Sequence, residues 1–263
     1  MSQETKFSMA LVTGATSGIG EALCFLLAHQ GIPLLISGRD HGKLEQLVVR
    51  LQKHVTVIAL VADLGVSGER KKLIEMISTY SPDLVINNAG MGLYGEALTH
   101  STAKQLEILT VNGEAVLEIT LEAARNLKLR NRPGVILNVA SSAAFQVFPE
   151  LAVYAATKTF VTNFSESFDQ EMKPYGIRVL TSCPGMVKTA FSRRAGGVSS
   201  TGVDKELVMT PKFAAQEIWQ QIQKGKAVHL FDWKYRLFTY LGNLLPKSWR
   251  IAVLRKSIKN KLG

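Results

Sequence analysis

Apolar runs alternate with amphipathic stretches along the whole chain of 263 residues. The apolar runs have the composition of strands buried on both faces, and we predict strands at 7–13, 33–37, 55–62, 83–87, 134–139, 177–182 and 227–231. The stretches between them follow the helical period, and we predict helices near 18–30, 41–53, 67–79, 101–129, 151–174 and 211–224.

This alternation predicts an α/β fold, in which a doubly wound, Rossmann-type parallel sheet has helices on both faces. No linker or internal repeat divides the chain, so we predict one domain over 1–232 and a basic helical extension over 233–263. The segment 190–210 has little periodicity and follows a strand end, where ligands of such sheets bind. We therefore expect it to form a mobile lid over a substrate.

The composition is that of a globular protein, with 46% hydrophobic and 20% charged residues. Its two cysteines, Cys24 and Cys183, form no disulfide framework and no metal-ligand spacing, which favours a reducing compartment. The N-terminus lacks the pattern of a signal peptide, and no apolar run approaches the ~20 residues that span a bilayer. We therefore expect a cytoplasmic protein without a metal site.

The C-terminal segment 225–263 contains nine Lys/Arg and one acid, and so carries +8 of the formal net charge of +10. Aromatic residues lie among these charges: Trp233, Tyr235, Phe238, Tyr240 and Trp249. Trp and Tyr beside basic residues suit a membrane interface, whereas apolar residues on two faces of 249–262 favour packing against protein. The alternatives are a peripheral membrane contact, a subunit contact, a cover over the pocket and a solvated cap. The absence of a nucleic-acid-binding module argues against nucleic acid.

Tyr154 and Lys158 suggest acid/base chemistry. A spacing of four residues in a predicted helix places both side chains on one face. A phenol with an ordinary pKa near ~10 is a poor acid or base at neutral pH, and an adjacent ammonium group lowers that pKa. Tyr154 is therefore a candidate general acid/base tuned by Lys158, although a half-buried tyrosine beside a lysine without function has the same pattern.

A glycine-rich stretch joins the first predicted strand to the first predicted helix. It reads Thr13-Gly14-Ala15-Thr16-Ser17-Gly18-Ile19-Gly20. Glycines at such a junction permit a tight turn and let a pyrophosphate approach the helix N-terminus. The spacing Gly-x-x-x-Gly-x-Gly differs from the commoner Gly-x-Gly-x-x-Gly fingerprint of dinucleotide-binding folds.

Three further motifs follow in order: Asn87-Asn88-Ala89-Gly90 after the fourth strand, Ser141 thirteen residues before Tyr154, and Pro184-Gly185 after the sixth strand. With the glycine-rich turn and the Tyr154/Lys158 pair, they resemble the short-chain dehydrogenase/reductase family, in its single-domain subgroup. The resemblance covers roughly residues 7–190. It implies a Rossmann-type enzyme that transfers a hydride between a nicotinamide cofactor and a carbonyl or alcohol.

The resemblance implies four catalytic residues. Tyr154 would donate a proton to the substrate carbonyl or remove it in oxidation, and Lys158 would lower the Tyr154 pKa and bind the nicotinamide ribose. Ser141 would hold the substrate oxygen, although Ser142 is adjacent and only the spacing selects between them. Asn112 matches a helix asparagine that holds a water joining Lys158 to solvent, and a helix residue without a catalytic role is the alternative.

The resemblance also implies a cofactor-binding set. Its members are Gly14, Thr16, Ser17, Gly18, Ile19, Gly20, Arg39, Asp63, Leu64, Asn88, Gly90, Tyr154, Lys158, Pro184, Gly185, Val187 and Thr189. The segment at Asp63 would contact the adenine, and Asn88 the adenosine-side ribose. Val187 and Thr189 would lie over the nicotinamide carboxamide, and Asn87 would brace the central strands.

Cofactor choice depends on the end of the second strand, Ser37-Gly38-Arg39-Asp40. An acid there would bind the free 2′-hydroxyl of NAD, whereas an arginine accommodates the 2′-phosphate of NADP. Gly38 stands where NAD-preferring relatives tend to carry Asp, and Arg39 follows it, so we predict NADP(H). Two observations argue against this prediction: Asp40 is adjacent and could bind the ribose in a shifted register, and Ser17 stands where many NADP(H) users place a second basic residue.

The residues that follow the strand ends are mostly apolar and are expected to line the substrate pocket. They are Met91, Gly92, Leu93, Tyr94, Phe145, Gln146, Val147, Phe148 and Met186, with the segment 190–210. This lining favours an apolar acyl, lipid or steroid-like substrate. Arg193 and Arg194 would either bind an anionic part of the substrate or remain solvated.

Two other functions fit parts of the pattern. A regulator or scaffold that senses NADP(H) without chemistry would usually lack the Tyr or the Lys, and both are present. A sugar-nucleotide epimerase shares Tyr-x-x-x-Lys but has a different glycine spacing and a longer C-terminal domain. We therefore expect an NADP(H)-dependent oxidoreductase that assembles as a homodimer or homotetramer.

Overall fold

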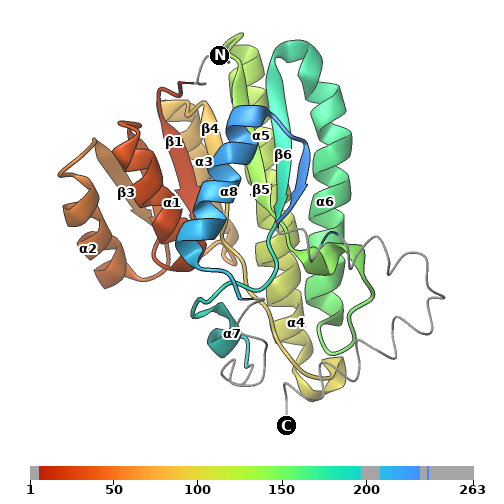
Figure 1. Ribbon diagram of the computed structural model, residues 1–263. Coiled ribbons are helices and arrows are strands. Elements are labelled where there is room, and N and C mark those ends of the chain that lie inside the picture. The colour runs from red at the N-terminus through yellow and green to blue at the C-terminus, as the bar shows by residue number, and fades with distance from the viewer. Residues whose placement is uncertain (1–5, 197–207, 232–235, 237–263) are drawn as a thin grey trace.

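The computed structural model describes residues 6–196, 208–231 and 236. Its strands are β1 (Ala10–Thr13), β2 (Leu34–Gly38), β3 (Val57–Val61), β4 (Leu84–Asn87), β5 (Gly134–Val139), β6 (Ile177–Cys183) and β7 (Val228–Leu230). They form one parallel sheet in the order β3-β2-β1-β4-β5-β6-β7 (Figure 1). The predicted doubly wound Rossmann-type sheet is confirmed, and each predicted strand overlaps an observed one.

The helices connect these strands. They are α1 (Gly18–His29), α2 (His41–Leu51), α3 (Ser67–Tyr80), α4 (Thr102–Leu109), α5 (Ala115–Leu129), α6 (Ala152–Met172), α7 (Phe191–Arg194) and α8 (Pro211–Lys224). Short 3₁₀ turns are η1 (Ala97–Thr99), η3 (Ser142–Phe145) and η4 (Lys173–Tyr175). Across the described ranges, none of the helices combines the length and apolar character that crossing a membrane would require.

Two predicted segments differ from the structure. The predicted helix 101–129 is divided by a π-helical segment, η2 (Thr110–Glu114), which joins α4 to α5. The segment expected to be irregular, 190–210, begins with helix α7, and Met209 near its end forms a parallel bridge with Val187. Most of the remaining lid segment and nearly all of the predicted tail lie outside the described residues, so those two interpretations stay predictions.

Alternate residues of the central strands pack into two different cores. In β1, Ala10 and Val12 belong to the core beneath α1, α2 and α8, whereas Leu11 belongs to the core beneath α3, α5 and α6. Adjacent side chains of a strand point to opposite faces, so a fully apolar strand needs helices on both sides. Accordingly α1 packs beside α8 on one face, and α3 packs beside α5 on the other (Figure 1).

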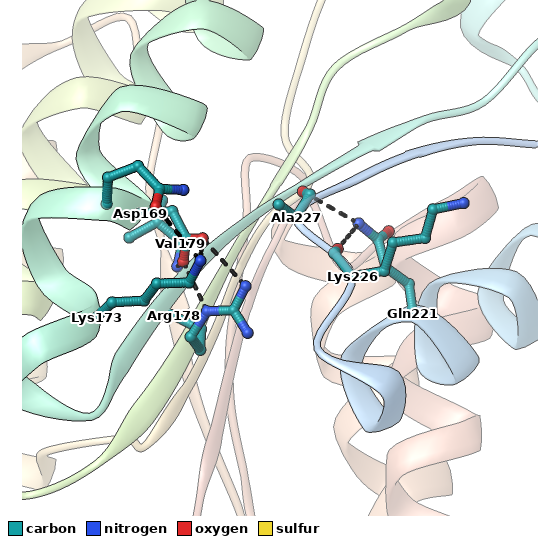
Figure 2. A network of polar contacts seen from close by, with 8 residues as sticks. Asp169, Lys173, Arg178, Val179, Gln221, Lys226 and Ala227 are labelled. Carbon is teal, nitrogen blue, oxygen red and sulfur yellow. Dashed lines mark hydrogen bonds and ion pairs between the residues drawn. The ribbon is translucent and has the colours of Figure 1, made fainter.

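Polar contacts tie β6 and its neighbour β7 to helices on both sides (Figure 2). Asp169 of α6 is buried and accepts hydrogen bonds from Arg178 Nε at 2.8 Å and from Val179 N at 2.8 Å. Gln221 of α8 donates to the backbone oxygen of Lys226, just before β7, at 2.8 Å. Because buried polar groups cost free energy when unpaired, these bonds fix where β6 and β7 can lie.

Candidate active site

A cavity of about 480 Å³ opens at the edge of the sheet where the strands end. Its wall contains residues that follow each strand from β1 to β6, and the order of the strands reverses between β1 and β4. Ligands of open α/β sheets bind in such a crevice. All the predicted site residues line this cavity except Gly20 and Asn112.

The glycine-rich turn is pressed against the end of β4. Asn88 Nδ2 donates to Thr13 O at 2.9 Å and to Gly14 O at 3.2 Å, and Thr13 Oγ1 accepts from the backbone N–H of Asn88 at 3.1 Å. A Cβ atom at Gly20 would lie 2.3 Å from Gly14 O and 2.5 Å from Asn88 Nδ2. Gly20 therefore lets α1 approach the turn, which explains why it is needed without lining the cavity.

The same turn leaves the N-terminus of α1 facing the cavity. Gly14 and Gly18 have φ values of 65° and 60°, in the left-handed region that favours glycine. Ser17, the N-cap residue, makes no side-chain hydrogen bond to the first turn of α1. The first N–H groups of that helix therefore have no cap and can bind an anion, which fits the pyrophosphate of a dinucleotide.

Charged side chains gather where β2 and β3 end. Arg39 Nη1 lies 3.6 Å from Asp63 Oδ2 and 4.0 Å from Glu107 Oε1. Asp40 caps α2 by accepting from Lys43 N at 3.1 Å, and its carboxylate lies 2.7 Å from Lys43 Nζ. The hydrogen bond from the Lys43 side chain lowers the pKa of Asp40. Arg39 and Asp40 both line the cavity, but Asp40 is already bonded to Lys43 at the start of α2.

Tyr154 and Ser141 meet at the cavity wall, one from α6 and the other from the end of β5. Withdrawal from water raises the pKa of Tyr154 to about 12, and a hydrogen bond with the Ser141 side chain opposes that rise. Ser141 Oγ also accepts from Ala143 N at 3.1 Å, which fixes its position at the start of η3. Ser142 lines the cavity too, but the bond to Tyr154 favours Ser141.

Lys158 is buried one turn farther along α6, where its Nζ donates to Val139 O at 2.8 Å. Burial lowers the pKa of Lys158 to about 8. Its Nζ lies 5.7 Å from the centre of the Tyr154 ring. The sequence predicts that Lys158 lowers the Tyr154 pKa, but the structure shows that pKa raised by desolvation. The difference arises because desolvation by burial has the largest effect on the Tyr154 pKa.

Asn112 lies behind the cavity wall, in the π-helical segment η2. Its Oδ1 accepts from Met91 N at 2.9 Å and its Nδ2 donates to Met91 O at 2.7 Å. A Cβ atom at Gly90 would lie 3.3 Å from Asn112 Oδ1 and 3.5 Å from Lys158 Nζ, so both side chains flank Gly90. Single π-helical turns are frequent at functional sites. Here the turn holds the loop after β4, and the water-mediated role of Asn112 stays a prediction.

A chain of buried hydrogen bonds runs beneath the site. Asn87 Nδ2 donates to Asn138 Oδ1 at 2.8 Å and to Thr120 Oγ1 at 3.1 Å. Asn138 Nδ2 continues the chain to Ser165 Oγ at 2.9 Å. These bonds join β4 and β5 to α5 and α6, as expected for Asn87 in bracing the central strands. Sequence reasoning missed the other three residues, Thr120, Asn138 and Ser165. A polar residue in an apolar strand, such as Asn138, could have indicated a buried hydrogen bond.

The substrate side of the cavity is partly as expected. Of the residues predicted to line it, Met91, Tyr94, Phe148 and Met186 do, whereas Gly92, Leu93, Phe145, Gln146 and Val147 do not. Phe191 of α7 lies on the wall, with its ring centre 5.7 Å from that of Tyr154. Leu151, three residues before Tyr154, also lines the cavity, and its position one helical turn away could have indicated it.

A family model described as short chain dehydrogenase matches residues 8–196, from just before β1 to the residues after α7. The chain belongs to the short-chain dehydrogenase family. A relative in Arabidopsis thaliana, named very-long-chain 3-oxoacyl-CoA reductase-like protein, is 32% identical over 258 residues, which cover 94% of this chain and 81% of that protein.

Solved structures of the family share this fold. A short-chain dehydrogenase from Sphingobium yanoikuyae in complex with NADPH has a TM-score of 0.81 at 26% identity, covering 90% of this chain and 93% of that chain. A 3-ketoacyl-(acyl-carrier-protein) reductase from Brucella melitensis complexed with NADH has a TM-score of 0.73 at 25% identity, covering 85% of this chain and 94% of that chain. Membership of this oxidoreductase family supports a nicotinamide cofactor, while these two structures hold different nicotinamides.

The pKa of Lys158 predicts how stability depends on pH. Its ordinary value is 10.5 and its value in the folded protein is about 8, so between them the unfolded chain holds a proton that the folded protein has lost. The free energy of unfolding of the wild type, minus that of Lys158→Met, should therefore rise with pH, by up to about 1.4 kcal/mol per pH unit. Urea unfolding from about pH 7 to about pH 9.5 measures this difference.

Tyr154→Phe is the matched control for this measurement. The pKa of Tyr154 is raised from 10.0 to about 12, so its proton affects stability only above pH 10, where the contribution is lost as pH rises. Its difference from the wild type should stay constant over the measured range. A flat difference for Lys158→Met would contradict the lowered pKa.

Proposed function

We propose that this protein is an NADP(H)-dependent oxidoreductase acting on a carbonyl or alcohol group of an apolar substrate. The observation that carries the proposal is the placement of Tyr154, Ser141 and buried Lys158 on the wall of one cavity, which they share with the glycine-rich turn. A sensor of NADP(H) without chemistry would have no need for this arrangement. Family membership supports the oxidoreductase class.

The side chains have complementary tasks in reduction. When bound, the reduced nicotinamide supplies a hydride to the carbonyl carbon of the substrate. Tyr154, which its raised pKa keeps protonated, would donate its proton to the carbonyl oxygen as negative charge grows there. The Ser141 hydroxyl would donate a hydrogen bond to the same oxygen. Lys158, with a pKa of about 8, would hold the nicotinamide ribose and exchange a proton near neutral pH.

Four observations support NADP(H) over NAD(H). Arg39 stands at the cavity wall at the end of β2. A Cβ atom at Gly38 would lie 2.6 Å from Thr16 Cγ2, so an acid at this position would displace the turn. Asp40 is engaged by Lys43 and by the first turn of α2. The solved relative from Sphingobium yanoikuyae binds NADPH.

An acyl substrate is favoured within the apolar class. The cavity wall around Tyr154 contains Met91, Phe148, Leu151 and Phe191. The Arabidopsis relative is named a 3-oxoacyl-CoA reductase-like protein, and the Brucella structure is a 3-ketoacyl reductase. We therefore propose a 3-oxoacyl compound ahead of a steroid-like one.

A cytoplasmic location is also part of the proposal, because Cys24 and Cys183 are buried free thiols. A peripheral membrane contact of the tail stays a prediction.

Tyr154→Phe tests the assigned acid. Turnover of a hydrophobic ketone or a 3-oxoacyl thioester should fall by about 10²–10⁴-fold, because the proton donor is gone. The dissociation constant of NADPH, followed by nicotinamide fluorescence, should stay within about twofold. Tyr80→Phe, at an exposed tyrosine of α3, is the matched control and should leave both unchanged. A variant that loses NADPH binding without a specific loss of rate would count against the assignment.

Arg39→Ala tests the cofactor preference. Loss of a charge-assisted hydrogen bond to the 2′-phosphate, about 1.5–3 kcal/mol, should weaken NADPH binding by about 10–150-fold and leave NADH nearly unchanged. Fluorescence titration with both nucleotides measures the ratio. Arg130→Ala, an exposed arginine at the end of α5, serves as the control. Preference of the wild type for NADH would overturn the proposal and make Asp40 the ribose contact.

We also propose that the protein is a homo-oligomer whose contact includes α4 and α6. Phe160, Phe164 and Phe168 stack along α6, with ring centres 6.0 Å and 5.5 Å apart. Phe160 is 44% exposed, and Leu106 and Leu109 of the neighbouring α4 are 55% and 51% exposed. A second copy of the same face would cover this apolar surface, as expected of a two-fold contact.

Phe160→Glu tests this contact, because it would bury a charge in the interface. Sedimentation equilibrium should show a subunit dissociation constant at least about tenfold higher, which corresponds to about 1.4 kcal/mol. Val49→Glu, at an exposed apolar residue of α2 on the other side of the sheet, is the control and should keep the assembly of the wild type. Unchanged assembly of Phe160→Glu would place the contact elsewhere.

A further inference from the structure

Arg194 of α7 reaches across the cavity to the glycine-rich turn. Its Nη2 donates to Ser17 Oγ at 3.1 Å, although the two residues are 177 positions apart in the chain. Both residues line the cavity. Ser17 stands where many NADP(H)-dependent relatives are expected to have a basic residue. The structure therefore brings a guanidinium group to a turn that lacks one in its own sequence.

The turn that Arg194 contacts lies beside Arg39. Thr16, the residue before Ser17, fills the space over Gly38, where a Cβ atom would lie 2.6 Å from Thr16 Cγ2. Arg39 follows Gly38 directly, so both guanidinium groups belong to one region of the cavity wall. Burial lowers the pKa of Arg194, and the positive charge of Arg39 lowers it further, which shows that the two charges repel each other.

The acidic residues nearby pair with Arg39 and Lys43 and not with Arg194. Asp63 and Glu107 lie near Arg39, and Asp40 is paired with Lys43. Within the part of the chain that the structure describes, no ion pair involves Arg194. Two neighbouring guanidinium groups, one of them without a carboxylate partner, suit an anion that carries more than one charge and several acceptor oxygens.

We propose that Arg194 is a second binding residue for the 2′-phosphate of NADP(H), opposite Arg39. The inference rests on the function proposed above and adds a specificity-determining residue from a distant part of the chain. α7 also carries Phe191 against Tyr154, and Tyr94 N donates to Ala195 O at 2.8 Å, just after the helix. The helix that would bind the phosphate, α7 (placed in Figure 1), is therefore also the one that carries Phe191 against Tyr154.

Titration calorimetry with two nucleotides tests this role without turnover. Adenosine 2′,5′-bisphosphate and adenosine 5′-monophosphate differ only in the 2′-phosphate. Arg194→Ala should weaken binding of the bisphosphate by at least about tenfold and leave the monophosphate within about twofold. Arg193→Ala is the matched control, because this neighbour on α7 has the same charge and does not line the cavity. It should leave the preference for the bisphosphate intact.

A rescue variant sharpens the test. Arg194→Ala combined with Ser17→Arg returns a guanidinium group to the turn and should recover most of the affinity for the bisphosphate. Equal weakening of both nucleotides by Arg194→Ala would show that Arg194 only holds α7 in place, and would overturn the proposal. A preference for the bisphosphate that Arg39→Ala abolishes and Arg194→Ala keeps would overturn the role of Arg194 alone. A wild type without that preference would overturn NADP(H) as the cofactor as well.

Discussion

The contact between the glycine-rich turn and the end of β4 is the constraint on which the site depends. The order of the strands reverses between the neighbours β1 and β4. The ends of these two strands must therefore approach each other without filling the crevice in which a ligand would bind. Thr13 and Asn88 satisfy this requirement, because each side chain bonds the backbone of the other segment. The contact leaves no room for a Cβ atom at positions 14 and 20, and glycine occupies both. The N-terminus of α1 is thereby held facing the same cavity as the end of β5 and the start of α6.

Burial, more than mutual attraction, sets the protonation of the proposed catalytic pair, Tyr154 and Lys158. Desolvation raises the pKa of Tyr154 and lowers that of Lys158, so it favours the neutral form of both groups. A neutral phenol is a proton donor, which suits reduction of a carbonyl. Oxidation of an alcohol would need the phenolate, and the structure directs the nearest ammonium to Val139 O instead. The proposed proton step would therefore be better prepared in the reductive direction, with Ser141 partly offsetting the effect of desolvation on the Tyr154 pKa.

Sequence reasoning succeeded where a strand fixes the position of a residue. Parallel strands bring their carboxyl ends to one edge, so a residue such as Arg39 or Ser141, just past a strand, has a predictable place. It failed where local backbone geometry depends on tertiary contacts. The π-helical segment around Asn112 interrupts a continuous helical period, because the buried amide must reach both backbone groups of Met91. Likewise, the pKa of Tyr154 depends on how much protein surrounds it, which the spacing to Lys158 does not encode.

Arg194 illustrates a third limit of sequence reasoning. The free energy that its ion pair would contribute to nucleotide binding depends on what surrounds that ion pair. An exposed ion pair contributes about 0.2–1 kcal/mol, whereas a hydrogen bond to a charged group that is partly shielded from water contributes about 1.5–3 kcal/mol. Arg194 is exposed where it lines the cavity, so only a nucleotide bound there would shield it from water, and its bond to Ser17 already restricts the guanidinium group. The motifs that resemble the family lie within roughly residues 7–190, so they do not include Arg194. A nucleotide preference built partly by the helix over the cavity would couple cofactor recognition to the placement of Phe191 over Tyr154, since one four-residue helix carries both contacts.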